Sequence, residues 1–326
     1  MMTNTSLIQS DTATAEATAA AAVAGHNANP TAHNWRSHTV AELYAYTDLN
    51  RPPIPLPCSD CLTTRGVGAN CCWDVGSQVW RTTEGTVATT DLWVFYRSLA
   101  LDRPMGNGRT RKMAFSADPS PLVGQNSGSN TKLPVAYGAG PTDSLVLTTS
   151  TSANAGVRTG GTATEVISTG ATESYYARSV FGVSAASSAV EEFNFRIGAE
   201  SASFTLSANA FGFAYDRGNQ LGALNPTNTQ TLIFFARKSP GVNVLRDTGV
   251  AITASKPDEH VLELLFDGTN LRYAVNGTEG TPIAAADVPA NQLLGFMCLN
   301  KSAGTTSRSV YVGSPFCAAR YTTPVA

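Results

Sequence analysis

The alternation of hydrophobic and polar positions is clearest between residues 175 and 321, where short apolar runs are separated by turn residues. The run "FNFRI" places its large apolar residues on one side and its polar residues on the other, which is the period-two pattern of a β-strand. The runs "FGFAYD", "TLIFFARK", "VLELLF", "NLRYAV" and "LLGFMCL" continue this pattern. Because no long helical period interrupts them, they predict an antiparallel β-sandwich. Its core is expected to bury Phe193, Phe195, Phe211, Phe213, Leu264 and Phe266.

The run "HVLELLFDGTNLRYAVNG", residues 260–277, predicts a hairpin within this sandwich. Asp267-Gly268 supplies the positive φ angles that a tight hairpin turn needs. Both rows of side chains on the first strand are largely apolar: Val261, Glu263 and Leu265 on one face, and Leu262, Leu264 and Phe266 on the other. A strand that is apolar on both faces is typical of the centre of a sheet.

Together, "FNFRI", "FGFAYDRG", "TLIFFARK" and "VLELLFDGTNLRYAVNG" resemble the concanavalin-like jelly-roll modules of bacteriophage tail fibres and other virion proteins. The similarity covers about residues 175–321, and it concerns the fold, because these motifs contain no site signature. It implies a jelly-roll domain with a structural or receptor-binding role, of the tail-fibre or head-decoration type.

Three segments precede the β-sandwich domain, which we place at residues 175–326. Residues 1–34 are an Ala/Thr-rich arm, extended or weakly helical, which is either a disordered tail or ordered against another chain. Residues 35–115 contain all four tryptophans and predict a small Trp-rich anchoring domain of β structure, with a short helix in "TVAELYAYTDL" and a hairpin turn at Asp74–Ser77. Residues 116–174 are predicted to be a Ser/Thr/Gly-rich linker or irregular β region.

The charge balance excludes some partners. The chain has 22 Lys and Arg against 24 Asp and Glu, a net charge of −2, so it has no electrostatic attraction to nucleic acid or to anionic membranes. No apolar stretch approaches the roughly 18 residues of a membrane span, and we expect no membrane insertion. The N-terminus lacks the pattern of a secretory signal, which predicts synthesis in the host cytoplasm.

We expect no enzymatic activity and no cofactor. The chain has no nucleophile elbow, zinc-protease helix, phosphate-binding loop or dinucleotide-binding glycine pattern. The acid pairs Glu191-Glu192 and Asp258-Glu259 consist of adjacent residues, which project to opposite faces of a strand. They do not resemble the facing carboxylates of a glycosidase, and we interpret them as solvated strand ends.

Four cysteines in "CSDCLTTRGVGANCCW" are the best candidate for a metal site. Cys58 and Cys61 have the spacing of a zinc knuckle, and Cys71 and Cys72 could complete four ligands. Adjacent side chains on a strand diverge, however, so Cys71 and Cys72 reach one ion only if the strand bulges. The four cysteines could form a reduced thiol cluster, a disulfide or a metal site. Because the geometry of the metal site is poor, we expect no stoichiometric zinc. His26, His33 and His38 form either a metal-binding trio or, as their Asn- and Pro-containing surroundings favour, a plain loop.

One turn of the sandwich is a candidate glycan contact. Tyr215, Asp216, Arg217, Asn219 and Gln220 are polar enough to hold a sugar, although polar turns occur in any sandwich.

These observations lead to three functional hypotheses. The first is a non-enzymatic phage virion structural protein, anchored to head or tail subunits through its N-terminal part. Its partners are other virion proteins and copies of itself, in a homotrimer. The second is a tail-fibre adhesin that binds a host surface glycan through sandwich loops. The third, a glycan depolymerase, has the least support because no catalytic constellation is present.

Overall fold

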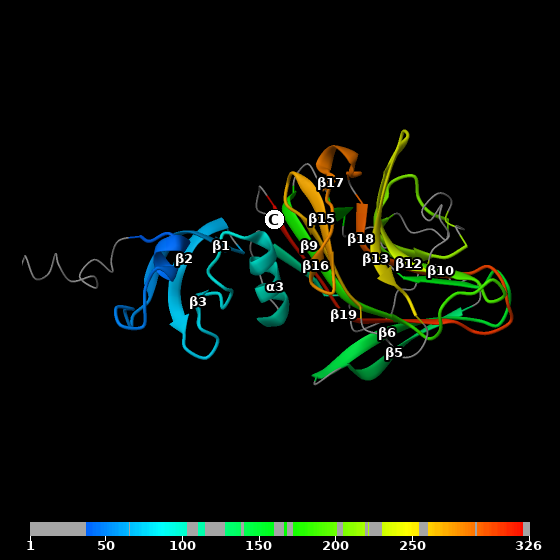
Figure 1. The fold of residues 1–326 in the computed structure, drawn as a ribbon, viewed down its shortest axis with the longest axis horizontal. Coiled ribbons are helices and arrows are strands. Elements are labelled where there is room, and N and C mark those ends of the chain that lie inside the picture. The colour runs from blue at the N-terminus through cyan, green and yellow to red at the C-terminus, as the bar shows by residue number, and fades with distance from the viewer. Residues whose placement is uncertain are drawn as a thin grey trace, which may run out of the picture. The chain divides into compact units, whose positions relative to one another are not determined.

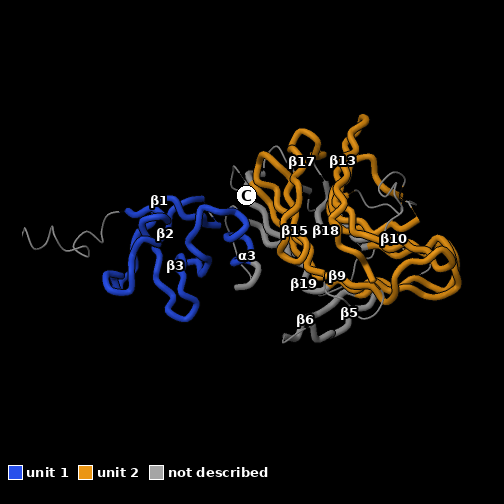
Figure 2. Tube along the Cα trace, viewed as in Figure 1, with its two compact units in different colours: residues 1–103 blue, residues 104–326 orange. Residues whose placement is uncertain are grey.

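The structure, a computed structural model, describes residues 37–64, 66–102, 110–114, 128–137, 140–159, 166–167, 172–200, 205–218, 221, 230–253, 260–290 and 292–321. The chain divides into two compact units, unit 1 with residues 1–103 and unit 2 with residues 104–326 (Figure 2). The predicted arm, residues 1–34, lies outside the described residues, so its ordering against another chain stays a prediction. In the described part of the chain, no helix is long and apolar enough to cross a membrane.

The described part of unit 1 combines a three-stranded antiparallel sheet with two helices (Figure 1). The sheet has the order β1-β2-β3, with β1 at Leu56–Thr63, β2 at Gly66–Asp74 and β3 at Val79–Thr82. The predicted hairpin between β2 and β3 is confirmed, and its Asp74 carboxylate accepts the Gly76 N–H at 3.0 Å. The predicted short helix is also confirmed as α2, Val40–Tyr44, which begins with a capping box of Thr39 and Glu42.

The second helix of unit 1, α3 at Leu92–Asp102, was not predicted. Its sequence, "LWVFYRSLALD", is rich in aromatic and β-branched residues, which usually favour strands. Asp91 nevertheless caps it, because its carboxylate accepts the Trp93 N–H at 2.7 Å. Trp93, Tyr96 and Leu99 follow at helical spacing and are buried. The capping aspartate and this spacing were the signals that the sequence contained.

Unit 2 is an antiparallel sandwich of two sheets, which confirms the predicted mainly β fold (Figure 1). The first sheet has the order β13-β12-β11-β10-β18-β7, with β8 beside β18. Its strands are β7 (Gly156–Thr159), β8 (Val166–Ile167), β10 (Phe193–Glu200), β11 (Ala210–Asp216), β12 (Thr231–Lys238), β13 (Val242–Ala251) and β18 (Gln292–Lys301).

The second sheet has the order β16-β15-β14-β9-β19-β6-β5, with β17 beside β15 and β4 beside β19. Its strands are β4 (Thr110–Ala114), β5 (Gly128–Tyr137), β6 (Gly140–Thr149), β9 (Thr172–Val183), β14 (His260–Phe266), β15 (Asn270–Val275), β16 (Thr278–Glu279), β17 (Ile283–Ala284) and β19 (Ser309–Tyr321). A short 3₁₀ helix, η1, spans Ala285–Asp287.

The core lies between the two sheets and is filled by alternate residues of their strands. All six residues predicted to be buried are at most 3% exposed, and all belong to one hydrophobic cluster. Aromatic pairs connect the sheets across this core. Phe181 of β9 stacks on Phe195 of β10 with ring centroids 5.0 Å apart. Phe234 of β12 stacks on Tyr273 of β15 at 4.2 Å. Such pairs add about 0.5–1.5 kcal/mol beyond their buried area.

The predicted central strand is confirmed as β14, which pairs with β9 on one side and β15 on the other. Leu262, Leu264 and Phe266 belong to the core, while Leu265 is buried on the opposite face. The turn to β15 has a hydrogen bond from the Asp267 N–H to the Asn270 carbonyl at 3.1 Å. Gly268 adopts φ +89° there, a conformation that favours glycine.

The Ser/Thr/Gly-rich segment predicted as a linker or irregular β region supplies regular strands. β6 pairs with β19 and β7 pairs with β18, so sheets of the sandwich include residues before the predicted start at 175. β5 and β7 end their sheets, where a strand has one neighbour, and Val157 of β7 is buried in the core. The boundaries of the four predicted segments otherwise stay a prediction.

Candidate functional site

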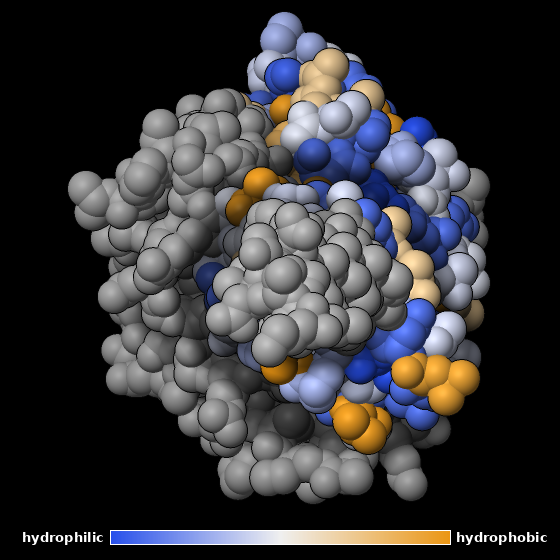
Figure 3. Space-filling view, turned by 90° about the vertical axis from the view of Figure 1, so that its left-hand side faces the viewer, coloured by the Kyte–Doolittle hydropathy of each residue, from blue (hydrophilic) through white to orange (hydrophobic). Residues whose placement is uncertain are grey.

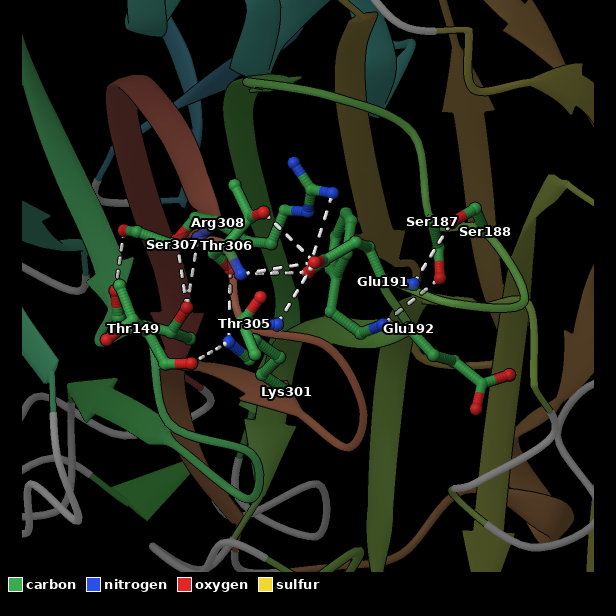
Figure 4. A network of polar contacts seen from close by, with 12 residues as sticks. Thr149, Ser187, Ser188, Glu191, Glu192, Lys301, Thr305, Thr306, Ser307 and Arg308 are labelled. Carbon is green, nitrogen blue, oxygen red and sulfur yellow. Dashed lines mark hydrogen bonds and ion pairs between the residues drawn. The ribbon is translucent and has the colours of Figure 1, made fainter.

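Three loops meet at one end of the sandwich, and Glu191 connects two of them, the loop that contains it and the loop after β18 (Figure 4). We call residues 150–155, 184–192 and 302–308, the loops that follow β6, β9 and β18, the Glu191 rim. The Glu191 carboxylate accepts the Thr305 N–H at 3.0 Å and the Thr306 hydroxyl at 2.9 Å. It also lies 3.7 Å from the guanidinium of Arg308. Glu191 is therefore an organiser of these loops, which corrects its interpretation as a solvated strand end.

Lys301 holds the same loops from the end of β18. Its side chain is buried, and its ammonium donates to the carbonyl oxygens of Ser150 at 3.3 Å, Thr151 at 2.8 Å and Thr306 at 3.1 Å. An ammonium has three donors, so these three carbonyls can satisfy all of them. Thr305, Thr306 and Ser307 remain exposed on the loop after β18, and Thr151, Ser152 and Asn154 are exposed on the loop after β6. The rim thus presents hydroxyl and amide groups on loops that these hydrogen bonds connect.

The charge state of Glu191 follows from these contacts. Partial burial pushes the pKa of Glu191 up, but the hydrogen bonds from Thr305 and Thr306 and the charge of Arg308 outweigh it. The pKa therefore lies below its usual value. The second predicted acid pair, Asp258-Glu259, lies outside the described residues.

Glu191→Gln is expected to destabilise the sandwich at pH 7, with a difference from the wild type that shrinks in acid. A depressed pKa means that the carboxylate stabilises the fold above the unfolded-state value of about 4.3. This stabilisation is lost as the pH falls through the lower folded-state pKa. Urea denaturation between pH 7 and pH 3, followed by circular dichroism, measures the difference. Glu192→Gln is the control, because the Glu192 carboxylate points away from this network (Figure 4). A pH-independent Glu191→Gln effect would contradict the assignment.

The predicted glycan-contact turn lies next to the rim, and the described part of it is mostly buried. Tyr215 is fully buried, and its hydroxyl accepts the N–H of Ser187, a rim residue, at 2.9 Å. Asp216 is also fully buried and accepts the Leu221 N–H at 2.8 Å. Both side chains shape the turn from inside, whereas Arg217 is partly exposed. Asn219 and Gln220 lie outside the described residues, so glycan contact at this turn stays a prediction.

Among the residues whose exposure the structure describes, most of the exposed large apolar side chains lie in unit 1. Leu49 is 99% exposed and Val75 is 78% exposed. Among the described residues, six of the seven exposed large apolar side chains belong to unit 1: Tyr44, Leu49, Ile54, Val67, Val75 and Val94. The space-filling view shows hydrophobic residues as separate groups among hydrophilic ones (Figure 3). Single exposed apolar residues are ordinary, so the feature to explain is that most of those in the described part of the chain belong to unit 1.

Charges beside these apolar residues are paired within unit 1. Arg51 binds Asp48 at 2.7 Å, and its guanidinium lies 3.4 Å from the ring centroid of Trp73. Arg81 binds Asp74 at 2.8 Å. Leu49 and Val75 are sequence neighbours of these ion pairs.

Three of the four predicted cysteine ligands meet inside unit 1. The sulfurs of Cys58, Cys61 and Cys71 all lie within 4.8 Å of one another, and those of Cys61 and Cys71 are 3.8 Å apart. These three side chains are buried in a hydrophobic cluster. Cys72 is exposed, which confirms that adjacent cysteines of this strand diverge. A hydrogen bond with Cys71 lowers the pKa of Cys61 to about 7, while burial raises that of Cys58 to about 12.

No family model and no curated protein matches the chain. Solved structures with a similar fold include the binding domain of botulinum neurotoxin DC in complex with rat synaptotagmin II, at TM-score 0.36 and 8% identity over 67% of this chain and 44% of that one. They also include a carbohydrate esterase from Shiga toxin-encoding bacteriophage phi24B, at TM-score 0.36 and 15% identity over 61% of this chain and 90% of the esterase chain. The alginate lyase AlyC3 matches at TM-score 0.37 and 10% identity over 54% of this chain and 75% of the lyase chain. The chain thus spans less than half of the neurotoxin chain. The class that the chain itself defines is a mainly β protein with a two-sheet antiparallel sandwich.

Proposed function

We propose that the chain is a non-enzymatic structural protein of a bacteriophage virion. Unit 1 attaches it to head or tail subunits, and unit 2 presents the sandwich. The observation that carries this proposal is that six of the seven exposed large apolar side chains among the described residues belong to unit 1. The phage assignment rests on the resemblance of residues 175–321 to jelly-roll modules of virion proteins.

The attachment would be mainly apolar. Burying a leucine or valine side chain contributes about 1.5–3 kcal/mol. Leu49 and Val75 alone would therefore stabilise contact with another virion subunit by about 3–6 kcal/mol. Because the neighbouring charges are paired inside unit 1, the partner is expected to be an apolar protein surface rather than a charged polymer. Copies of the same chain are expected to associate as a homotrimer, which multiplies these contacts.

The double variant Leu49→Asp/Val75→Asp is expected to reduce incorporation into purified particles at least tenfold, because two carboxylates would replace buried apolar groups. Quantitative mass spectrometry of the particles measures copies per particle. Val190→Asp is the matched control, since Val190 is 75% exposed but belongs to unit 2, and its incorporation should stay within twofold of the wild type. Absence of the wild-type protein from particles, or equal loss in both variants, would sink the proposal.

A second candidate, an adhesin that binds a host surface glycan, is favoured by the Glu191 rim. Its hydroxyl and amide groups are held on loops that Lys301 and Glu191 restrain, and preorganised polar groups lose less entropy on binding. A glycan array with the purified full chain distinguishes the two functions. Binding that is lost on Thr151→Ala, with particle incorporation unchanged, would assign the rim to glycan recognition.

A further inference from the structure

We propose that unit 1 is a zinc-binding module in which Cys58, Cys61, Cys71 and His38 bind one Zn²⁺. This proposal does not depend on the proposed function. It replaces the expectation of no stoichiometric zinc. That expectation rested on the divergence of Cys71 and Cys72, which excludes Cys72 alone from the site.

The spacing of the sulfurs fits zinc. A zinc–sulfur bond is about 2.3 Å long, so two thiolates of a tetrahedral site lie about 3.8 Å apart. The sulfurs of Cys61 and Cys71 are 3.8 Å apart, and that of Cys58 lies within 4.8 Å of both. The surrounding cluster of Leu43, Leu56, Trp80 and Ala88 is buried and would shield an ion from water.

An irregularity in β1 places the thiols of Cys58 and Cys61 on the same side of the strand. Residues three apart on a regular strand face opposite sides of the sheet. The pairing of β1 with β2 shifts register between Cys58 and Leu62, and both Cys58 and Cys61 are buried as a result. Bulges of this kind redirect side chains and are common beside functional sites. Cys71 then reaches the same cluster from β2.

His38 supplies the fourth ligand. It forms a parallel bridge with Cys58, so the two side chains lie on the same face, and it is 1% exposed. Its Nε2 lies 3.1 Å from the Tyr46 hydroxyl, while its Nδ1 is buried without a hydrogen-bond partner. A buried polar atom without a partner is costly, and a metal ion would use it. His38 is not among the three ligand groups that already meet, so binding includes a movement of its ring toward the sulfurs.

The resulting ligand set suits a structural site. Three cysteines and one histidine are a common closed set for structural zinc. Tyr46 would hold the second ring nitrogen, as outer-shell partners of metal-bound histidines do. On binding, each thiol loses its proton to solvent, and three thiolates with a neutral imidazole leave the site with a charge of −1. The ion would join the segment before α2 to β1 and β2.

The test compares two neighbouring cysteines of the purified full chain. After a chelator wash, elemental analysis should find about one zinc per chain in the wild type and in Cys72→Ser, and less than about a tenth of that in Cys71→Ser. Cys72→Ser is the matched control, because Cys72 is the adjacent residue and is exposed. Equal zinc contents in the two variants, or none in the wild type, would overturn the proposal.

Three further measurements keep the proposal testable if Cys71→Ser does not fold. Cobalt titrated into zinc-stripped wild-type protein should produce a thiolate charge-transfer band that saturates at about one ion per chain. A thiol count in denaturant that reveals a Cys61–Cys71 disulfide would instead overturn it. His38→Gln should weaken zinc at least tenfold in competition with a chelator. Unchanged affinity would remove His38 from the ligand set.

Discussion

Glu200→Ala is expected to destabilise the sandwich by about 3–5 kcal/mol, because it leaves the Arg196 guanidinium buried without its carboxylate. The two side chains are 1% and 2% exposed, and Arg196 Nε lies 2.7 Å from Glu200 Oε2. The other carboxylate oxygen accepts the Ser207 N–H at 2.9 Å. Burial raises the pKa of Glu200 despite the nearby Arg196, which means that desolvation of this pair offsets much of its attraction.

The double variant Arg196→Met/Glu200→Leu separates the net contribution of the ion pair from the penalty of leaving Arg196 buried without its partner. Replacing a buried ion pair by apolar residues is often neutral, so we expect it to lie within about 1–2 kcal/mol of the wild type. Urea denaturation followed by far-ultraviolet circular dichroism measures both variants. Tryptophan fluorescence serves as an internal control, because all four tryptophans lie within residues 1–103. If Glu200→Ala lost less stability than the double variant, the pair would not be an energetic unit.

Phe234→Ala is expected to cost about 3–5 kcal/mol, through lost burial and the cavity that it leaves between the sheets. Phe234 is fully buried, and its ring centroid lies 4.2 Å from that of Tyr273 and 5.2 Å from that of Phe213. It therefore connects both sheets at one point. The same denaturation experiment measures the loss. Val190→Ala, at an exposed position, should stay within about 0.5 kcal/mol of the wild type. A Phe234→Ala loss below about 1 kcal/mol would show that the core collapses around the cavity.

The cysteine cluster shows how a correct local rule led to an incomplete interpretation. The divergence of Cys71 and Cys72 is a property of any extended strand, so the sequence was enough to predict it. The register shift in β1 and the approach of His38 to Cys58 are pairings between segments. Nothing local to "CSDC" indicates that its two thiols turn to the same side, or that a histidine 20 residues earlier lies beside them.

The sequence by itself determined the mainly β class, the strands β10, β11, β12, β14, β15 and β18, the buried aromatic rows and the capped helix α2. These features depend on side-chain alternation and helix capping, which involve residues only a few positions apart, so the order of residues in the sequence is enough to predict them. Only the tertiary structure decided that Glu191 binds Thr306, 115 positions away, that Tyr215 is buried, and that the Ser/Thr/Gly-rich segment forms strands of the sandwich. Each of these depends on which segments meet across the sheets. The physical reason is that burial and hydrogen bonding between distant segments decide whether a polar side chain organises the fold or faces solvent.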